Sequence, residues 1–329
     1  MIIFTVMKLN NSLLGLVLLW FISIQCVETT ITIRVLPDAH YTMRFHSRGD
    51  SSDIFNDDFP HPVGENWSQS SMKEENGEND TWIQITHGLL SGIQEFPSVI
   101  KSFIPLNHTI QVEKTDGWIA TQYKVDYIFS GRKAFQKYPE FAKQITGVFS
   151  DSTQWISEVL TYIVSRGMET LQLHEDTAID PDLVERLQNH MRGYFTHIKE
   201  KDLFEELDQD FLRKAFSPFI GDISQNYLQS LSKAMAPFEK GLRVTSGLSD
   251  DGIKLHVFLP GLLTTHNADS VLGDTLQWSF GLDAFLNDDY RIQAKSIVYS
   301  QRQIQAVILG ITVLVLLIIW IIFKSKNRD

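Results

Sequence analysis

The sequence holds very little cysteine and little basic charge for its length. Its 329 residues include one cysteine, Cys26, which excludes an internal disulfide and any cysteine cluster around zinc or iron–sulfur. Acidic residues outnumber basic ones by 40 to 29, and the net charge of −11 argues against binding to nucleic-acid phosphates. The 10 prolines and 19 glycines are too few for a collagen-like or generally disordered chain. We therefore expect a folded protein with no nucleic-acid partner.

The short motifs of common enzymes are missing as well. The sequence contains no GxSxG, no Walker loop, no GxGxxG and no HExxH. His190 and His197 are seven residues apart and would share a helix face, where Glu175 or Asp176 could complete a metal site. Exposed polar side chains explain this pattern more simply. We predict no catalytic residue, no cofactor-binding residue and no metal ion.

The first of two apolar runs lies near the N-terminus. Lys8 and the apolar run Leu13–Ile24 are typical of a secretory signal peptide, so residues 1–26 are predicted to form one. The run is shorter than the roughly 20 residues that a membrane helix needs. Cys26 stands where a bacterial lipoprotein is lipidated and is a candidate lipidation site. Because a small residue is expected directly before such a cysteine and Gln25 stands there, a bystander cysteine is the alternative.

The second apolar run predicts a membrane helix at residues 306–323, AVILGITVLVLLIIWIIF. Its 18 uncharged residues would cover about 27 Å as a helix, close to the hydrocarbon thickness of a bilayer. Lys324, Lys326 and Arg328 follow, and such basic residues stay on the cytoplasmic side. We predict a single-pass protein of the cell membrane, with residues 27–305 outside and the tail 324–329 in the cytoplasm. Its first expected partner is therefore the membrane itself.

The body opens with alternating residues that predict antiparallel strands. Ile31, Ile33 and Val35 share one face, a turn follows at Pro37–His40, and alternation resumes from Tyr41. Residues 47–80 are rich in Ser, Asn, Asp and Glu and are predicted to form a long loop.

The next part of the body mixes strands and helices. Over 81–105 we expect a short strand and then a helix that ends before Pro105. A hairpin is predicted from Ile110 to Phe129, with its turn at Thr115–Gly117.

From about 134 to 241 the apolar period becomes helical. A helix that starts near Ser150 or Asp151 is expected to end at Gly167. Asp180-Pro181 predicts a second helix start, and Ser217-Pro218 predicts a later one. Alternation then returns in three segments, at 253–259, 276–280 and 290–298.

Strands that flank a helical block predict one α+β domain rather than two domains. The expected fold is an antiparallel sheet from N- and C-terminal strands with a central helical insertion, plus one C-terminal transmembrane helix. Without residues 1–26 and 306–329 the chain loses four bases and one acid, so the body 27–305 carries a charge near −14.

Two stretches of this body carry a resemblance to a known family. ITIRVLPDAHYTMRF (31–45) resembles the opening of LppM-like bacterial envelope lipoproteins, which place a strand and a "PDG"-type turn just after the lipidated cysteine. Here Ala39 replaces the glycine. PGLLTTHNADSVLGDTLQWSF (260–280), YRIQAKS (290–296) and the single span also look like that group. The resemblance covers the two ends of the body only. It implies an envelope-anchored α+β domain and supplies no catalytic residue.

Three functions stay open on this basis. The first is a non-catalytic, membrane-anchored binding protein of a bacterial envelope, with an envelope protein or a lipid-like molecule as ligand. The second is a membrane-anchored hydrolase whose carboxylate or histidine chemistry would come from residues converging in one pocket: Asp250, Asp251, Asp288, His190 or His256. The third is a eukaryotic surface protein with glycans at the sequons of Asn66, Asn79 and Asn107.

Overall fold

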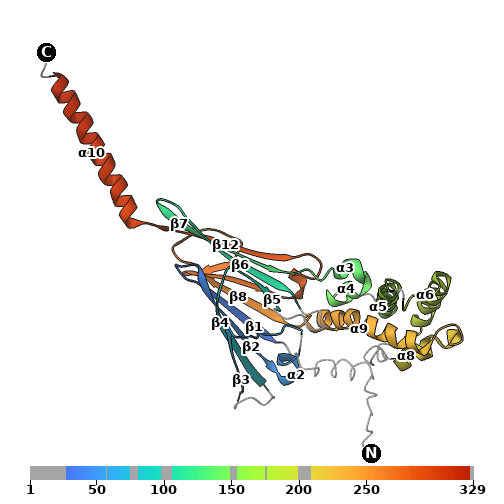
Figure 1. Cartoon of the computed structure of the whole chain (residues 1–329). Coiled ribbons are helices and arrows are strands. Elements are labelled where there is room, and N and C mark those ends of the chain that lie inside the picture. Colours follow the sequence, from blue (N-terminus) through green and yellow to red (C-terminus); the bar gives the residue numbers. More distant parts are fainter. Residues whose placement is uncertain are drawn as a thin grey trace, which may run out of the picture.

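The computed structural model describes residues 27–56, 58–74, 81–97, 106–148, 154–174, 176–198 and 209–326. Two β-sheets pack face to face over one hydrophobic core. Helices gather at one end of this sandwich, and a long helix leaves from the other end (Figure 1). The predicted α+β class, with strands before and after a helical insertion and one C-terminal apolar helix, is confirmed.

Sheet A has seven strands in the order β10-β11-β8-β1-β2-β4-β3. β1 and β8 are parallel and the other neighbours are antiparallel. Its strands are β1 (Glu28–Val35), β2 (His40–Asp50), β3 (Trp67–Lys73), β4 (Thr81–Ser91), β8 (Gly252–Phe258), β10 (Ser270–Leu272) and β11 (Thr275–Phe280).

Sheet B has five strands in the order β5-β6-β7-β12-β9, all antiparallel. They are β5 (Ile93–Phe96), β6 (His108–Asp116), β7 (Ala120–Phe129), β9 (Leu262–His266) and β12 (Tyr290–Tyr299). The predicted hairpin at 110–129 is confirmed as β6 and β7.

Side chains fill the space between the sheets. Alternate residues of the central strands point inward, so β2 buries Tyr41, Met43 and Phe45 while β7 buries Tyr127 and Phe129. Their rings meet across the gap through His108, which is tilted against Phe45, edge-on to Tyr127 and stacked on Phe129. Among the described residues, the facing sheets therefore share a packed interior.

The helical insertion lies between β7 and β8 in the chain and beyond one end of the sandwich (Figure 1). Its helices are α3 (Ala134–Lys137), α4 (Pro139–Ile145), α5 (Gln154–Gln172), α6 (Pro181–Phe195), α8 (Gln209–Ala215) and α9 (Gln225–Gly247), with a 3₁₀ turn η1 (Ser217–Phe219). The start predicted at Asp180-Pro181 is confirmed, since the Asp180 side chain accepts from the Asp182 N–H and Pro181 takes the first helical position.

Buried polar contacts fasten this insertion to the sheets. Arg132, just after β7, donates from Nε to Thr245 Oγ1 at 2.9 Å and from Nη2 to the Gly241 carbonyl at 2.7 Å, both on α9. Gly131 allows the chain near η2 (Leu282–Ala284) and β12 to approach, because a Cβ there would lie 2.4 Å from the Asn287 carbonyl oxygen. This region is called the helical end below.

Two loop and helix predictions before residue 105 are wrong for the described residues. The segment 47–80 contains the end of β2, the short helix α2 (Ser51–Ile54) and the edge strand β3. At 81–96 strands β4 and β5 replace the expected helix, and residues 98–105 lie outside the described part. In β4 the buried Gln84, Thr86 and Gly88 alternate with more exposed residues, a period of two hidden by polar and small side chains.

Two predicted helix boundaries are also wrong. α5 runs past Gly167 to Gln172, and Gly167 instead lets α9 pack closely, because a Cβ there would lie 2.6 Å from Met235 Cγ. Ser217-Pro218 opens only η1, and α9 starts after Ser224, whose hydroxyl accepts from the Tyr227 N–H. The expected start at Ser150 or Asp151 lies outside the described residues.

The last element is the helix α10 (Gln301–Lys326), which follows β12 after the single residue Ser300. An 18-residue window within Gln301–Ile321 has a mean hydropathy of 2.8, and none of that window is buried against the body. By length and composition this helix could span a membrane. The two segments predicted as signal peptide and lipidation site, residues 1–26 with Cys26, lie outside the described part of the chain.

Candidate functional site

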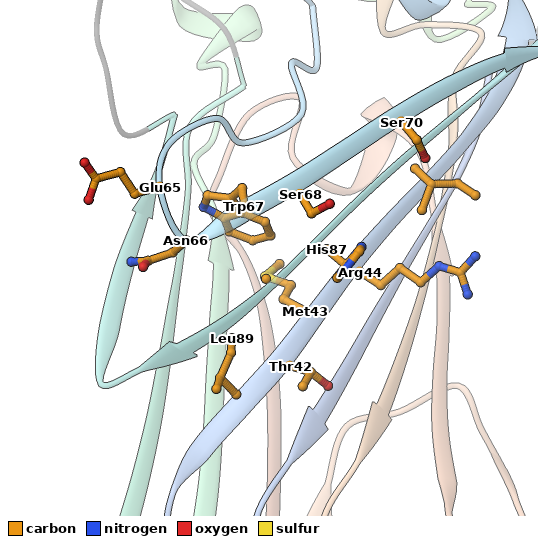
Figure 2. Close-up of a pocket in the computed structure, with 12 residues that line it drawn as sticks. Thr42, Met43, Arg44, Glu65, Asn66, Trp67, Ser68, Ser70, His87 and Leu89 are labelled. Carbon is orange, nitrogen blue, oxygen red and sulfur yellow. The ribbon is translucent and has the colours of Figure 1, made fainter.

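An open groove of about 720 Å³ lies on the outer face of sheet A. It crosses β2, β4 and β3, and the loop before β3 forms one wall (Figure 2). The lining residues are Thr42, Met43, Arg44, Glu65, Asn66, Trp67, Ser68, Ser70, Ile85, His87, Gly88 and Leu89. The lining combines polar and charged side chains with the apolar surface of Trp67, Ile85 and Leu89, which suits a partner that has both polar and apolar groups.

Strand register explains why these side chains meet. Alternation turns Thr42 and Arg44 of β2 outward while their neighbours face the core. Arg44 pairs across the sheet with His87 of β4, and His87 pairs with Ser68 of β3. A guanidinium, an imidazole and a hydroxyl therefore form one cross-strand row, in which Figure 2 shows Arg44 and His87 side by side.

A glycine shapes the wall of the groove. Gly88 lies opposite Trp67, and a Cβ at position 88 would come within 2.8 Å of Trp67 Cε3 and 2.7 Å of the Asn66 carbonyl oxygen. The Trp67 ring also makes edge-on contacts with Phe45 and Phe96 of the core. Any side chain at position 88 would displace this tryptophan and the loop that carries Asn66.

The outer face of sheet A carries several basic side chains, although the body as a whole is acidic. Lys254 is 2.6 Å from Glu28, whose pKa it lowers by donating a hydrogen bond. Arg48 is 2.8 Å from Glu74, and the Arg34 guanidinium lies over the Phe258 ring at 4.5 Å. Arg44 has no carboxylate partner among the described residues.

The uncompensated charge of Arg44 therefore sits at the groove. Beside it His87 can donate or accept a hydrogen bond, and the Thr42, Ser68 and Ser70 hydroxyls can do both. This set of groups can bind a carboxylate or another oxyanion through charge-assisted hydrogen bonds. The side chains that line the groove are therefore suited to binding an acidic group.

A buried serine–histidine contact lies on the inner side of the same sheet. His61 is hydrogen-bonded through Nε2 to Ser47 Oγ at 2.8 Å and through Nδ1 to Thr86 Oγ1 at 2.9 Å, and Ser47 Oγ is 2.6 Å from Thr29 Oγ1. All four residues are buried. Burial lowers the pKa of His61 to about 4, so its ring is neutral at pH 7. A hydroxyl takes the place a carboxylate holds in a catalytic triad, and the network joins strands and loop in the core.

The histidines considered for a metal site have other surroundings. His190 Nε2 is 2.9 Å from the carbonyl oxygen of Ala215, to which it donates a hydrogen bond, so this nitrogen is occupied. His197 lies after the end of α6, and Glu175 lies outside the described residues. Within the described ranges no group of three or more His, Cys, Asp or Glu could hold a metal ion.

The residues considered for a hydrolase are distributed over the molecule. His190 is on α6 in the helical insertion, whereas His256 is on the outer face of β8, paired with Thr32 and Gln277. Asp288 lies between η2 and β12. Asp250 and Asp251 are neighbours between α9 and β8.

Asp251 has the most perturbed environment of these residues. Burial, followed by the nearby charge of Asp58, raises the pKa of Asp251 to about 7. Its charged neighbours are the carboxylates of Asp53, Asp58 and Asp250, and its hydrogen-bond donor is the Val27 backbone. The structure thus brings Asp251 close to other acids and to the start of β1.

The sequence did not indicate the groove. β3 lies within the segment predicted as a loop, and the strand alternation at 41–45 was used for the buried face only. The outward set Thr42, Arg44 and His46 was a usable signal for a basic face. Of the three sequon asparagines, Asn66 is exposed and lines the groove, Asn107 is exposed elsewhere, and Asn79 lies outside the described residues.

Comparison with known proteins gives one weak likeness. No protein-family description matches the sequence, and no curated protein matches it significantly. The NMR structure of the folded domain of Mycobacterium tuberculosis LppM is similar over 85% of this chain and 94% of that domain, with 7% sequence identity and a TM-score of 0.29. A likeness at this level does not assign the chain to that family and carries no functional argument.

Proposed function

We propose that this protein is a single-pass, membrane-anchored binding protein without catalytic activity, and that it takes its partner on the outer face of sheet A. α10 supports the anchoring, because it is long, apolar and uncovered by the body. The bases Lys324, Lys326 and Arg328 support a cytoplasmic C-terminus with the body on the other side. The signal-like segment 1–26 agrees with this orientation.

The single observation that carries the binding proposal is the groove with its uncompensated Arg44. Arg44 is a basic group without a carboxylate partner among the described residues, on a body with a charge near −14, and it favours an acidic group of the partner at this point of the groove. The described interior between the sheets is filled with side chains, so a buried lipid-like ligand is less well supported. We propose an acidic segment of an envelope protein as the occupant.

The proposal is tested by crosslinking in intact cells that make the full chain. A photo-reactive amino acid replaces Leu89, an exposed side chain that lines the groove. The control position is Leu173, which is exposed in the helical insertion. We expect a defined adduct at position 89 that is absent at position 173, and an acidic crosslinked segment on mass spectrometry.

Charge reversal then separates a specific groove from general adhesion. Arg44→Glu is expected to abolish the position-89 adduct, whereas Lys233→Glu on the exposed face of α9 leaves it unchanged. Equal adduct yields in both variants would contradict the groove. Substrate turnover by the purified full chain at enzymatic rates would contradict the absence of catalysis.

A further inference from the structure

Turns at the end of the sandwich opposite the helical insertion expose apolar side chains. The turn of the β6–β7 hairpin, Gly117–Ile119, carries Trp118 with 66% of its surface exposed and Ile119 with 38%. Leu262, the first residue of β9, is 65% exposed, and Leu272, at the turn between β10 and β11, is 70% exposed. We call this set, Trp118, Ile119, Leu262 and Leu272, the apolar tips.

Strand register places the apolar tips at one end. Tyr299, the last residue of β12, pairs with Ala120 next to the hairpin turn, and Leu262 pairs with Ile297. Thr275, next to the β10–β11 turn, pairs with Phe258 at the end of β8 that leads to β9. The chain leaves the sandwich at this same end to form α10 (Figure 1).

The hairpin turn is fixed directly to the start of the anchor. The backbone N–H of Ser300 donates to the Ile119 carbonyl oxygen at 2.8 Å, and α10 begins at the next residue, Gln301. Ser300 is therefore shared by β12, the hairpin turn and the helix. Such a junction holds the turn that carries Trp118 beside the first residue of α10, so the position of this turn along the axis of α10 is fixed.

If α10 spans a bilayer, this position of the turn along the helix axis lies close to the bilayer surface. The uncharged segment of α10 starts at Ala306, six residues after Ser300, which is about 9 Å along a helix. The headgroup layer on each side of the hydrocarbon core is roughly 5–8 Å thick. The exposed Trp118 at this level is within reach of the interface, where tryptophan is enriched in membrane proteins.

Local charge does not supply the attraction. The turn residue Asp116 accepts a hydrogen bond from Thr121 at 2.8 Å and lies 3.4 Å from Lys114, so its charge is used within the hairpin. Asp38 and Asp274 lie in other turns of this end, and Arg302 is the nearest base on α10. Because acidic and basic residues are nearly balanced at this end of the sandwich, burial of apolar surface would drive its contact with the membrane.

We infer that the apolar tips, led by Trp118, insert into the interface of the bilayer that α10 crosses, so that the sandwich rests on the membrane in a fixed posture. This inference rests on the proposed anchoring by α10. It gives the exposed tips one occupant, lipid headgroup and upper acyl chain, and it holds the helical insertion away from the membrane. The groove of sheet A then faces sideways, where it is open to a partner in the same envelope layer.

The test measures the depth of a spin label in the full chain, reconstituted one copy per nanodisc of phosphatidylcholine and phosphatidylglycerol. In a Cys26→Ser background, Trp118→Cys reports the tip, Leu173→Cys reports an exposed site in the helical insertion, and Leu314→Cys reports the middle of α10. Electron paramagnetic resonance compares collisions with oxygen, which partitions into lipid, and with a water-soluble nickel complex.

We expect the label at 118 to collide with nickel several-fold less often than the label at 173, and with oxygen more often. Equal nickel collision rates at 118 and 173 overturn the inference. The label at 314 separates the two proposals: a lipid depth at 314 with an aqueous signal at 118 rejects only the tip insertion, whereas an aqueous signal at 314 rejects the anchoring. Shielding at 118 that persists in lipid-free detergent dimers would identify a second copy as the occupant and overturn the inference as well.

Discussion

The two ends of the β-sandwich differ in how their apolar side chains are covered. At the helical end the chain covers itself: Arg132 bonds to α9, and Gly131 and Gly167 permit close approach. At the end that leads to α10 short turns leave Trp118 and Leu272 exposed. Apolar surface that a chain leaves uncovered points to cover from outside, and with the anchoring that we propose for α10 this cover would be a membrane.

The largest expected effect distinguishes the two ends by stability. Arg132→Ala removes charged donors from the buried Thr245 hydroxyl and Gly241 carbonyl, so we expect the free energy of unfolding to fall by about 4 kcal/mol. Trp118→Ser removes an exposed side chain, and we expect a change below about 0.5 kcal/mol. Denaturant unfolding of the full chain in detergent measures both.

The control for the arginine is Arg243→Ala, since Arg243 makes an exposed pair with Glu239 at 2.7 Å and should contribute about 0.5 kcal/mol or less. Similar losses for Arg132→Ala and Trp118→Ser would remove the distinction between a self-covered end and an externally covered one.

The next largest effect is the pH dependence of the free energy of unfolding, which depends on Asp251 at the junction of the helical insertion with sheet A. The folded pKa of Asp251, about 7, lies above its ordinary value of 3.8, so the folded state binds the extra proton and loses stability as pH rises through this window. Asp251→Asn should therefore stabilise the protein at pH 8 by about 2–3 kcal/mol and change little at pH 4.

Two interior histidines respond in the opposite direction. Burial lowers the pKa of His61 to about 4 and that of His108 to about 3, so their contribution to stability is present above pH 6.5 and is lost as pH falls. In the parent chain, protonation of Asp251 on acidification offsets part of the stability that the two histidines lose. Asp251→Asn removes this offset, so its unfolding midpoint should fall more steeply on acidification than that of the parent chain. The exposed Asp274→Asn, whose carboxylate is not among the neighbours that shift Asp251, is the control, and a pH-independent gain in Asp251→Asn would refute the assigned cause.

The smallest gain in stability is expected at the turn end. Ala39 lies between β1 and β2 with a φ of 72°, in the left-handed region that favours glycine. Ala39→Gly should stabilise the fold by roughly 0.5–1 kcal/mol, after the larger entropy loss of glycine is subtracted. Ala39→Val should destabilise it, and thermal unfolding of both variants checks the sign. Stabilisation by valine would show that the turn does not hold this conformation.

The sequence predicted those parts of the fold in which large apolar residues recur with the period of a strand or a helix. Alternation at 31–45 and 119–129 identified strands, and Asp180-Pro181 identified a helix start. It failed where a period is carried by polar or small residues, as in Gln84, Thr86 and Gly88 of β4, because such residues are buried here only through pairing with distant strands.

The candidate site was predictable only in its basic side chains of β2, and its assembly from three strands was not, for a related reason. Arg44, Ser68 and His87 meet through the register of three strands, one of which has the composition of a loop. Glycine has the same ambiguity: Gly167 is a helix terminator by local rules, yet it sits inside α5 because α9 packs against it. Local chemistry predicts where a segment can turn, and tertiary packing decides whether it does.

The most direct test of the central claim, a body held outside the membrane by α10, is cysteine labelling on intact cells. Leu173→Cys reports the helical insertion and Ser325→Cys the tail, each with a membrane-impermeant maleimide and with the parent chain as baseline. The account predicts labelling at 173 in intact cells and labelling at 325 only after permeabilisation. Labelling at 325 in intact cells, or at 173 only after permeabilisation, would contradict it.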